Sequence, residues 1–201
     1  MNEPSPARES LGAERSFERS AELRERLRAG DRAAVEELFR DHYAALVGFA
    51  DGYVRSGAVA EEIVQDVFLN LWRGRDRLAG EGTLRAYLFQ AVRNRALNHL
   101  RHARHVARHA AAAPRDDSAP ALGDALLVEA ELAAAVRAAV DALPERCREV
   151  FLLSRGHNLS YVEIARTLEI SVKTVETQMG RALKAIRRAL LPYLEGRGKA
   201  P

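Results

Sequence analysis

The sequence predicts an all-α protein made of two small helical domains joined by a flexible linker. Apolar residues recur three, four or seven positions apart along most of the 201-residue chain, as they do on one face of a helix. No stretch alternates as a strand does. Around residues 107–123 this periodicity gives way to alanine, aspartate, serine and proline, a composition typical of a linker.

The linker sets the predicted domain boundaries. Residues 1–17 are polar, contain Pro4 and Pro6 and lack periodicity, so we expect a disordered N-terminal tail. The remaining divisions are a first domain at 18–106, the linker at 107–123, a second domain at 124–195 and a C-terminal tail at 196–201.

Four helices are expected in the first domain, and residues that cap or terminate helices mark their ends. Gly30 is a common type of helix terminator, and Asp31 and Thr83 are plausible N-caps. The two glycines of 80–82 predict a loop before the last helix. The expected helices lie at about 20–28, from 32 to near 56, at about 59–73 and from 84 to the linker.

The second domain reads as helices interrupted by short turns. A helix at about 124–142 should stop at Leu143, and the next should run from Glu145 to about 154. Ser160 and Glu163 form a capping box that starts a short helix, and Ser171 caps a longer one. The residues expected to face inward on this longer helix are Val172, Val175, Met179, Leu183, Ile186 and Leu190.

Residues 159–186 predict a helix-turn-helix, because a short capped helix, a three-residue turn and a longer helix follow one another. In this motif the second helix enters the major groove of DNA, and its first outward-facing residues reach base edges. The alternative is an ordinary helical hairpin with solvated charges. The candidate DNA-binding residues are Ser171, Lys173, Thr174, Glu176, Thr177, Arg181 and Lys184, and Arg187 and Arg188 suit phosphates.

A second candidate DNA-binding surface is the helix at 83–108, which belongs to a stretch without acidic residues that extends to residue 113. Arginines can follow phosphates, aromatic rings can stack on exposed bases and amides can bond to base edges. The alternative is a basic helix face that is only solvated. Tyr87 and Phe89 could equally be core residues. The candidates are Arg85, Tyr87, Gln90, Arg93, Asn94 and Asn98.

The sequence gives little support for catalysis or for metal binding. The sequence lacks a phosphate-cradling glycine loop, a nucleophile elbow and an HExxH motif, so we expect neither an enzyme nor a cofactor. Cys147 reads better as a core residue than as a nucleophile. His102, His105 and His109 share a helix face, but the surrounding arginines oppose a cation, so no metal is expected.

The location expected from the sequence is the cytoplasm, with no insertion into a membrane. The single cysteine fits a reducing compartment, and the charged N-terminus does not read as a secretory signal. No run of about 18 apolar residues is present to span a bilayer.

Both halves resemble the extracytoplasmic-function (ECF) group of sigma-70 factors, residues 27–104 resembling region 2 and residues 132–190 resembling region 4. Two motif sets in the right order around a linker make the resemblance specific. The stretches that carry it in the first half are 28–31, 37–40 with Tyr43, 65–72, 84–88 and 93–101. In the second half they are 142–144, 150–152, 159–165 and 170–176.

The resemblance implies an alternative sigma factor that directs core RNA polymerase to promoters and melts the −10 region. Region 2 would bind the β′ clamp helices through Asp66, Val67, Phe68, Asn70, Leu71 and Trp72. The −10 element would be held by Arg85, Tyr87, Gln90, Arg93, Asn94, Asn98 and Arg101. Region 4 would read the −35 element through the helix that starts at Ser171 and pack on the β flap. An anti-sigma factor is a further expected partner.

Many ECF members carry tryptophan where Tyr87 stands, which leaves the stacking geometry undecided. The rival hypothesis is a free-standing helix-turn-helix regulator with an N-terminal sensor or dimerisation domain. The basic helix at 83–108 separates the two hypotheses, because a sensor domain has little use for it.

Overall fold

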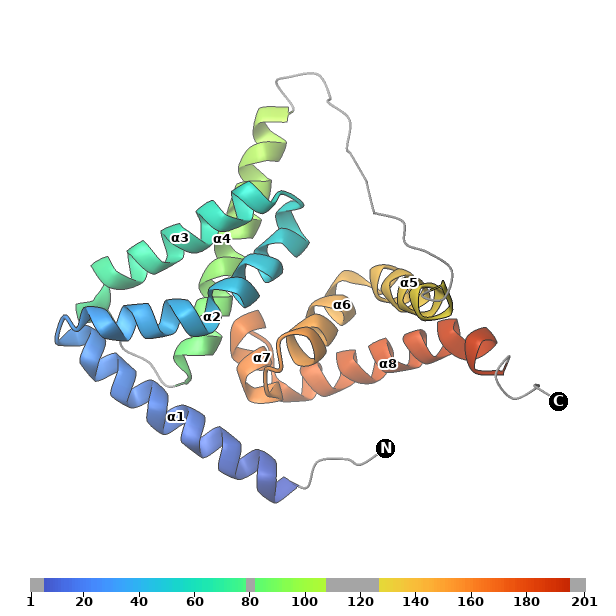
Figure 1. Cartoon of the computed structure of the whole chain (residues 1–201), viewed down its shortest axis with the longest axis horizontal. Coiled ribbons are helices and arrows are strands. Elements are labelled where there is room, and N and C mark those ends of the chain that lie inside the picture. Colours follow the sequence, from blue (N-terminus) through green and yellow to red (C-terminus); the bar gives the residue numbers. More distant parts are fainter. Residues whose placement is uncertain (1–5, 79–81, 108–126, 196–201) are drawn as a thin grey trace. The chain divides into compact units, whose positions relative to one another are not determined.

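The computed structural model describes residues 6–78, 82–107 and 127–195, and all its regular elements in these ranges are helical (Figure 1). The α-helices are α1 (Pro6–Arg28), α2 (Arg32–Val54), α3 (Gly57–Arg73), α4 (Leu84–Ala107), α5 (Leu127–Asp141), α6 (Glu145–Phe151), α7 (Tyr161–Leu168) and α8 (Val172–Glu195). A 3₁₀ turn, η1 (Arg75–Arg77), follows α3, and a π turn, η2 (Leu152–Gly156), follows α6. The all-α prediction is therefore confirmed.

The chain divides into two compact units. The N-terminal unit carries α1–α4, and the C-terminal unit carries α5, α6, η2, most of α7, and α8. Most of the predicted linker, residues 108–123, lies outside the described residues, as do the C-terminal tail and two of the three loop positions at 80–82. The predicted domain boundaries therefore stay a prediction.

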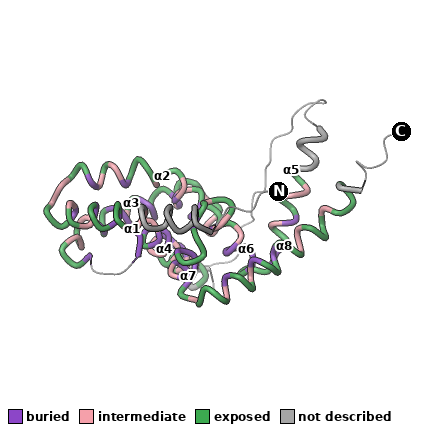
Figure 2. The backbone as a smooth tube through the Cα atoms, turned by 90° about the horizontal axis from the view of Figure 1, so that it is seen from below, coloured by how far each residue is buried: buried purple, intermediate pink, exposed green. Residues whose placement is uncertain are grey.

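The core of the N-terminal unit lies between α2, α3 and α4, which pack on one another. Each helix contributes large side chains that are fully buried, among them Leu46 on α2, Val64 on α3 and Phe89 on α4. Phe49 meets the ring of Phe89 edge-on, with 5.1 Å between the ring centroids. Buried residues follow the inward sides of these helices (Figure 2). Phe89 is thus a core residue, whereas Tyr87 is 41% exposed.

The first helix is much longer than the sequence predicted. It begins at Pro6 rather than near Ser20, so the predicted start of this helix is wrong. Proline is well placed at a helix start, and the alanine, glutamate, arginine and leucine that follow are strong helix formers. Here intrinsic propensity outweighs the missing apolar periodicity. Residues 1–5 lie outside the described residues.

Most of the predicted caps in the N-terminal unit are confirmed. Gly30 ends α1 with a positive φ of 79°, and the Asp31 carboxylate accepts a hydrogen bond from the Ala33 N–H at 2.9 Å. The Thr83 hydroxyl accepts from the Ala86 N–H at 3.2 Å at the start of α4. The end of α2 depends instead on Arg55, a non-glycine residue with a φ of 52°.

A small cluster of buried residues joins α6 to α8 in the C-terminal unit. It contains Leu143, Cys147 and Ala182, with three half-buried side chains packed around it, Phe151, Ala185 and Ile186. The inward stripe of α8 differs from the predicted one, because Val172 and Leu183 are 39% and 44% exposed. Ala182 takes the inward place that the sequence assigned to Leu183, since the smaller side chain allows close approach to α6.

Within the described residues, no helix is both long and apolar enough to cross a membrane.

Candidate nucleic-acid interfaces

A groove of about 580 Å³ between α3 and α4 brings predicted site residues of the N-terminal unit together. It gathers Asp66, Val67 and Asn70 from α3 and Tyr87, Asn94 and Asn98 from α4, so residues predicted for two different partners line one surface. The rest of its lining is Val59, Glu62, Ile63, Ala91, Arg95, His99 and His102.

The chemistry of this groove suits an unpaired base. The exposed Tyr87 ring offers an apolar face for stacking. The exposed carboxamides of Asn94 and Asn98 lie one helical turn apart and carry both donors and acceptors for base edges. An ion pair between the Arg95 guanidinium and the Asp66 carboxylate joins the two helices beside them.

Arg95 is a groove residue that the sequence analysis did not single out. Its ion pair holds α4 against α3, and both side chains remain more than a third exposed. Two sequence signals point to it: its place among the arginines of the stretch without acidic residues, and its spacing of four residues from Ala91 and from His99, which puts all three on one helix face. Its partner, Asp66, lies 29 residues earlier, a distance over which local patterns carry no information.

The other residues predicted for the −10 element lie outside the groove lining. Arg85, Gln90 and Arg93 are half-buried, and Arg101 is exposed farther along α4. Arg85 and Arg93 lie on other faces of α4 than the groove residues, and each of the four is available to DNA only to the extent that it is exposed.

The face of α3 predicted to bind a partner divides into buried and exposed residues. Val67, Phe68 and Leu71 are 5%, 5% and 1% exposed and pack largely in the core, and their contact with a partner stays a prediction. The exposed apolar residue is Leu69, at 51%, which the prediction omitted. Asn70 is exposed, and Trp72 is half-buried beneath the Arg75 guanidinium, 4.5 Å from its ring centre.

The predicted helix-turn-helix has the expected local geometry. The Ser160 N–H donates to the Glu163 carboxylate at 2.9 Å, and the Glu163 N–H donates to the Ser160 hydroxyl at 3.3 Å, so the capping box is confirmed. Glu169 takes a positive φ of 56° at the end of α7, and the Ser171 hydroxyl caps α8 by accepting from the Thr174 N–H at 3.1 Å.

One face of α8 presents most of the residues predicted to contact DNA. Lys173, Glu176, Thr177, Arg181 and Lys184 are all exposed and follow helical spacing. The Lys173 ammonium and the Glu176 carboxylate form an exposed ion pair at 3.0 Å. Ser171 and Thr174 instead use their hydroxyls in the helix cap, where their oxygens are 2.8 Å apart.

The side chains considered for catalysis or metal binding have other surroundings. Cys147 is buried, and its thiol donates to the Gln178 side-chain carbonyl at 3.0 Å, which agrees with the core interpretation. No group of three or more His, Cys, Asp or Glu side chains is arranged to hold a metal ion in the described part of the chain. The side chain of His105 and all of His109 fall outside that part.

Comparison with known proteins shows that the two candidate interfaces lie in stretches that match two regions of one protein family. The description "Sigma-70 region 2" matches residues 38–106, and "Sigma-70, region 4" matches residues 133–186. The RNA polymerase sigma factor CarQ of Myxococcus xanthus is 32% identical over 174 residues, which cover 83% of this chain and 94% of CarQ. The chain belongs to the sigma-70 family.

Further relatives place this sigma factor in the ECF group. The ECF RNA polymerase sigma-E factor of Escherichia coli K12 is 29% identical over 181 residues, covering 86% of this chain and 94% of that protein. The solved sigma factor RpoE of Bartonella quintana, in complex with the anti-sigma factor NepR, has the same fold. Its TM-score is 0.60 at 21% identity, over 77% of this chain and 95% of that chain.

The sigma factor is an alternative one that directs RNA polymerase, and its two regions divide between the two units. Region 2 includes the groove between α3 and α4, and region 4 includes the helix-turn-helix of α7 and α8. The rival hypothesis of a free-standing regulator is not favoured, because region 2 accounts for α2–α4 without a sensor domain.

Proposed function

We propose that this sigma factor works through three surfaces and acts by binding alone, without catalysing a reaction. The exposed residues of α3 dock on the core polymerase, the groove between α3 and α4 captures the unpaired −10 strand, and α8 reads the −35 duplex. The observation that carries the proposal is the groove itself, where a tyrosine ring and two exposed carboxamides line one concave surface.

Polymerase docking is assigned to the exposed part of α3. Leu69 and Trp72 supply apolar area, and Asp66 and Asn70 lie at the edge that this surface shares with the groove. We assign this surface to the β′ clamp helices, and Val67, Phe68 and Leu71 support it from the core. Docking on a helical partner through an apolar centre with a polar rim follows the general anatomy of protein interfaces.

Strand capture is assigned to α4 because its chemistry fits single-stranded rather than paired DNA. A flipped base costs a few kcal/mol to unstack, and stacking on Tyr87 with amide contacts from Asn94 and Asn98 offsets that cost. Arg85, Gln90, Arg93 and Arg101 provide further polar and cationic groups along the same helix. Melting then follows from preferential binding of the opened strand.

Duplex reading is assigned to the exposed face of α8. Lys173, Glu176 and Thr177 stand on its first two turns, where helix-turn-helix proteins contact base edges. Arg181 and Lys184 continue the face with cations suited to phosphates. Ser171 and Thr174 act by fixing the helix start, and region 4 also packs on the β flap of the polymerase.

The decisive experiment is run-off transcription. The purified chain, added to bacterial core RNA polymerase and a library of genomic promoter fragments, should yield transcripts from a small set of promoters that share −10 and −35 elements. Core polymerase alone and the chain alone are the controls. If promoter-specific transcripts do not depend on the chain, the proposed function is wrong.

We further propose an anti-sigma factor as a partner and the cytoplasm as the site of action. RpoE of Bartonella quintana, which shares the fold, was solved in complex with the anti-sigma factor NepR. Purification of the tagged chain from its own cells at native expression level, followed by run-off transcription, tests this. A co-purifying protein that suppresses the transcripts when added back supports the proposal, and full activity of the native complex contradicts it.

A further inference from the structure

Three side chains of α1 hold the ends of the segment that leads into α4. Ser20, Arg24 and Arg28 are spaced four residues apart and therefore form one stripe along the helix. The Arg28 guanidinium donates to the carbonyl of Leu78, and the Arg24 guanidinium donates to the carbonyl of Gly82. Residues 78 and 82 are thus both fixed to the same helix.

Ser20 also caps α4 from a distant part of the chain. Leu84 is the first residue of α4, and its N–H has no acceptor within the helix. The Ser20 hydroxyl accepts that hydrogen bond at 3.2 Å, across 64 residues of sequence. The Thr83 hydroxyl accepts the Ala86 N–H beside it, and Ser20 and Thr83 are 7% and 2% exposed. The first turn of α4 is therefore fixed from two sides.

The fixed turn carries the aromatic ring of the groove. Tyr87 follows Leu84 by three residues, and its own N–H donates to the Thr83 carbonyl at 3.2 Å. Gly82, just before the turn, has a φ of +124°, a conformation that favours glycine and sets the direction in which the chain enters α4. A displacement of this turn would move the Tyr87 ring relative to Asn94 and Asn98.

We propose that Ser20, Arg24 and Arg28 are positioning residues for capture of the −10 strand. They keep the entry to α4 in its binding geometry before DNA arrives, so the strand does not have to order it. None of the three lines the groove, so they act through Tyr87 and its neighbours rather than on DNA. The inference rests on the proposed function of that groove.

A matched pair of double variants tests the proposal in the holoenzyme. Arg24→Ala with Arg28→Ala removes the contacts to residues 78 and 82. Arg19→Ala with Arg26→Ala, on the same helix, removes two arginines that contact Asp31, Glu37 and Asp41 instead. Both pairs lose two positive charges from α1. The conservative Arg24→Lys with Arg28→Lys variant restores charged donors at the test positions.

The probe is a fluorescein-labelled single strand that carries the non-template −10 sequence of a promoter mapped by transcript-start sequencing. We expect the Arg24 and Arg28 pair to bind it about tenfold more weakly, with reduced discrimination among single-base changes. The Arg19 and Arg26 pair loosens the ion pairs between α1 and α2 but keeps the contacts to residues 78 and 82, so its loss of affinity should stay below about threefold. The lysine variant should recover part of the affinity. Core polymerase affinity should be unchanged in all of them.

The salt dependence separates positioning from direct contact. A lost phosphate contact on a single strand lowers the slope of log affinity against log salt by about 0.7, whereas a positioning role leaves the slope unchanged. A lower slope, equal weakening in both double variants, or unchanged binding in the test pair would each overturn the inference. If wild-type holoenzyme does not bind the strand, the proposed function itself fails and this inference falls with it.

Discussion

At the scale of single residues, the side chains of the groove and those of α8 differ in whether a neighbouring side chain already holds them. Tyr87 and Asn94 are exposed and need no rearrangement to meet a base. Glu176 is held in an ion pair with Lys173, so replacing either also frees its partner. Both side chains are exposed, so the ion pair itself contributes little stability, and under the proposed function it orients two groups toward the bases.

Replacing Tyr87 with alanine should weaken binding of the unpaired −10 strand. Stacking of one base on an aromatic ring contributes about 1–3 kcal/mol, which corresponds to a loss of about five- to 150-fold in affinity. Tyr87→Phe keeps the ring and should stay close to wild type, and Tyr87→Trp should bind at least as well because its ring is larger. Anisotropy of the labelled strand with holoenzyme measures this. Equal losses in the alanine and phenylalanine variants would exclude stacking.

Variants on α8 should divide into two classes. Lys173→Ala or Glu176→Ala should change which −35 sequence is selected, by about 1–3 kcal/mol at one base pair. Arg187→Ala or Arg188→Ala should weaken binding to all sequences alike and lower the salt slope by about one per lost phosphate contact. Selection from a randomised −35 library, repeated at two salt concentrations, measures both effects. If the two classes behave alike, the assignment of the recognition face is wrong.

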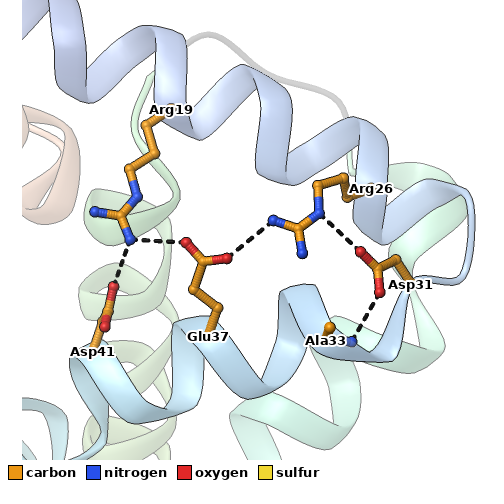
Figure 3. A network of polar contacts seen from close by, with 6 residues as sticks. All are labelled: Arg19, Arg26, Asp31, Ala33, Glu37 and Asp41. Carbon is orange, nitrogen blue, oxygen red and sulfur yellow. Dashed lines mark hydrogen bonds and ion pairs between the residues drawn. The ribbon is translucent and has the colours of Figure 1, made fainter.

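At the scale of elements, α1 is attached to α2 by a chain of charged side chains (Figure 3). Arg19 contacts Glu37 at 2.8 Å and Asp41 at 2.9 Å, and Arg26 contacts Asp31 at 2.8 Å and Glu37 at 3.0 Å. The Arg19 and Arg26 hydrogen bonds hold the pKa of the Glu37 carboxyl below its ordinary value, and Arg26 does the same to the pKa of Asp31. Ionised carboxylates therefore contribute to the attachment of α1, beside the buried side chains of Leu23 and Leu27.

Acid should loosen α1 before it unfolds the core. Because the pKa values of Asp31 and Glu37 are lowered in the folded chain, their stabilisation is present above the ordinary carboxyl range near pH 4. It is lost as the pH falls through the lowered values. Hydrogen exchange should show α1 losing protection as the pH falls below the ordinary carboxyl range, while α3 keeps its protection.

The variant Glu37→Gln is the control for this acid effect. It should lower α1 protection at neutral pH and flatten the further loss on acidification, because the central carboxylate of the network is already absent. High salt should have a similar, smaller effect, since the groups are exposed and screened. Parallel loss of protection in α1 and α3 would contradict the expected order.

Contacts between residues close in the sequence could be predicted, whereas contacts between different helices could not. The capping box of Ser160 and Glu163 and the cap at Asp31 join residues two or three positions apart, so the sequence contains the whole interaction. The ion pair of Asp66 with Arg95 and the cap that Ser20 gives to α4 join different helices. No periodicity predicts such contacts, because they depend on how the helices pack.

The same distinction explains the errors in burial. Both α3 and α8 have wide apolar surfaces, and periodicity alone does not say which stripe faces the core. On α3 the structure buries Phe68 and exposes Leu69, and on α8 it buries Ala182 and exposes Leu183. In each case the neighbouring helices decide, because only one stripe matches their surface. The candidate site could therefore be assigned to α3, α4 and α8 from the sequence, but not residue by residue.

At the scale of the whole molecule, each unit carries its own apolar core, and this separation predicts a local response to a core defect. Leu143 is 5% exposed and packs in the cluster that joins α6 to α8. Leu143→Ala removes buried methyl groups and leaves a cavity, which costs about 2–5 kcal/mol in comparable cores. Because α8 contributes Ala182 to this cluster, we expect selection of the −35 sequence to weaken together with the stability of the C-terminal unit.

Hydrogen exchange on the full chain measures that response. Amides of α6 and α8 should exchange faster in Leu143→Ala, while amides of α2, α3 and α4 should keep their protection, since none of the cluster's side chains comes from these helices. Binding of the single-stranded −10 probe to holoenzyme should change little, because its groove lies between α3 and α4. Leu143→Met, which nearly conserves volume, is the matched control. Equal deprotection of both groups of helices would mean that the chain unfolds as one cooperative body.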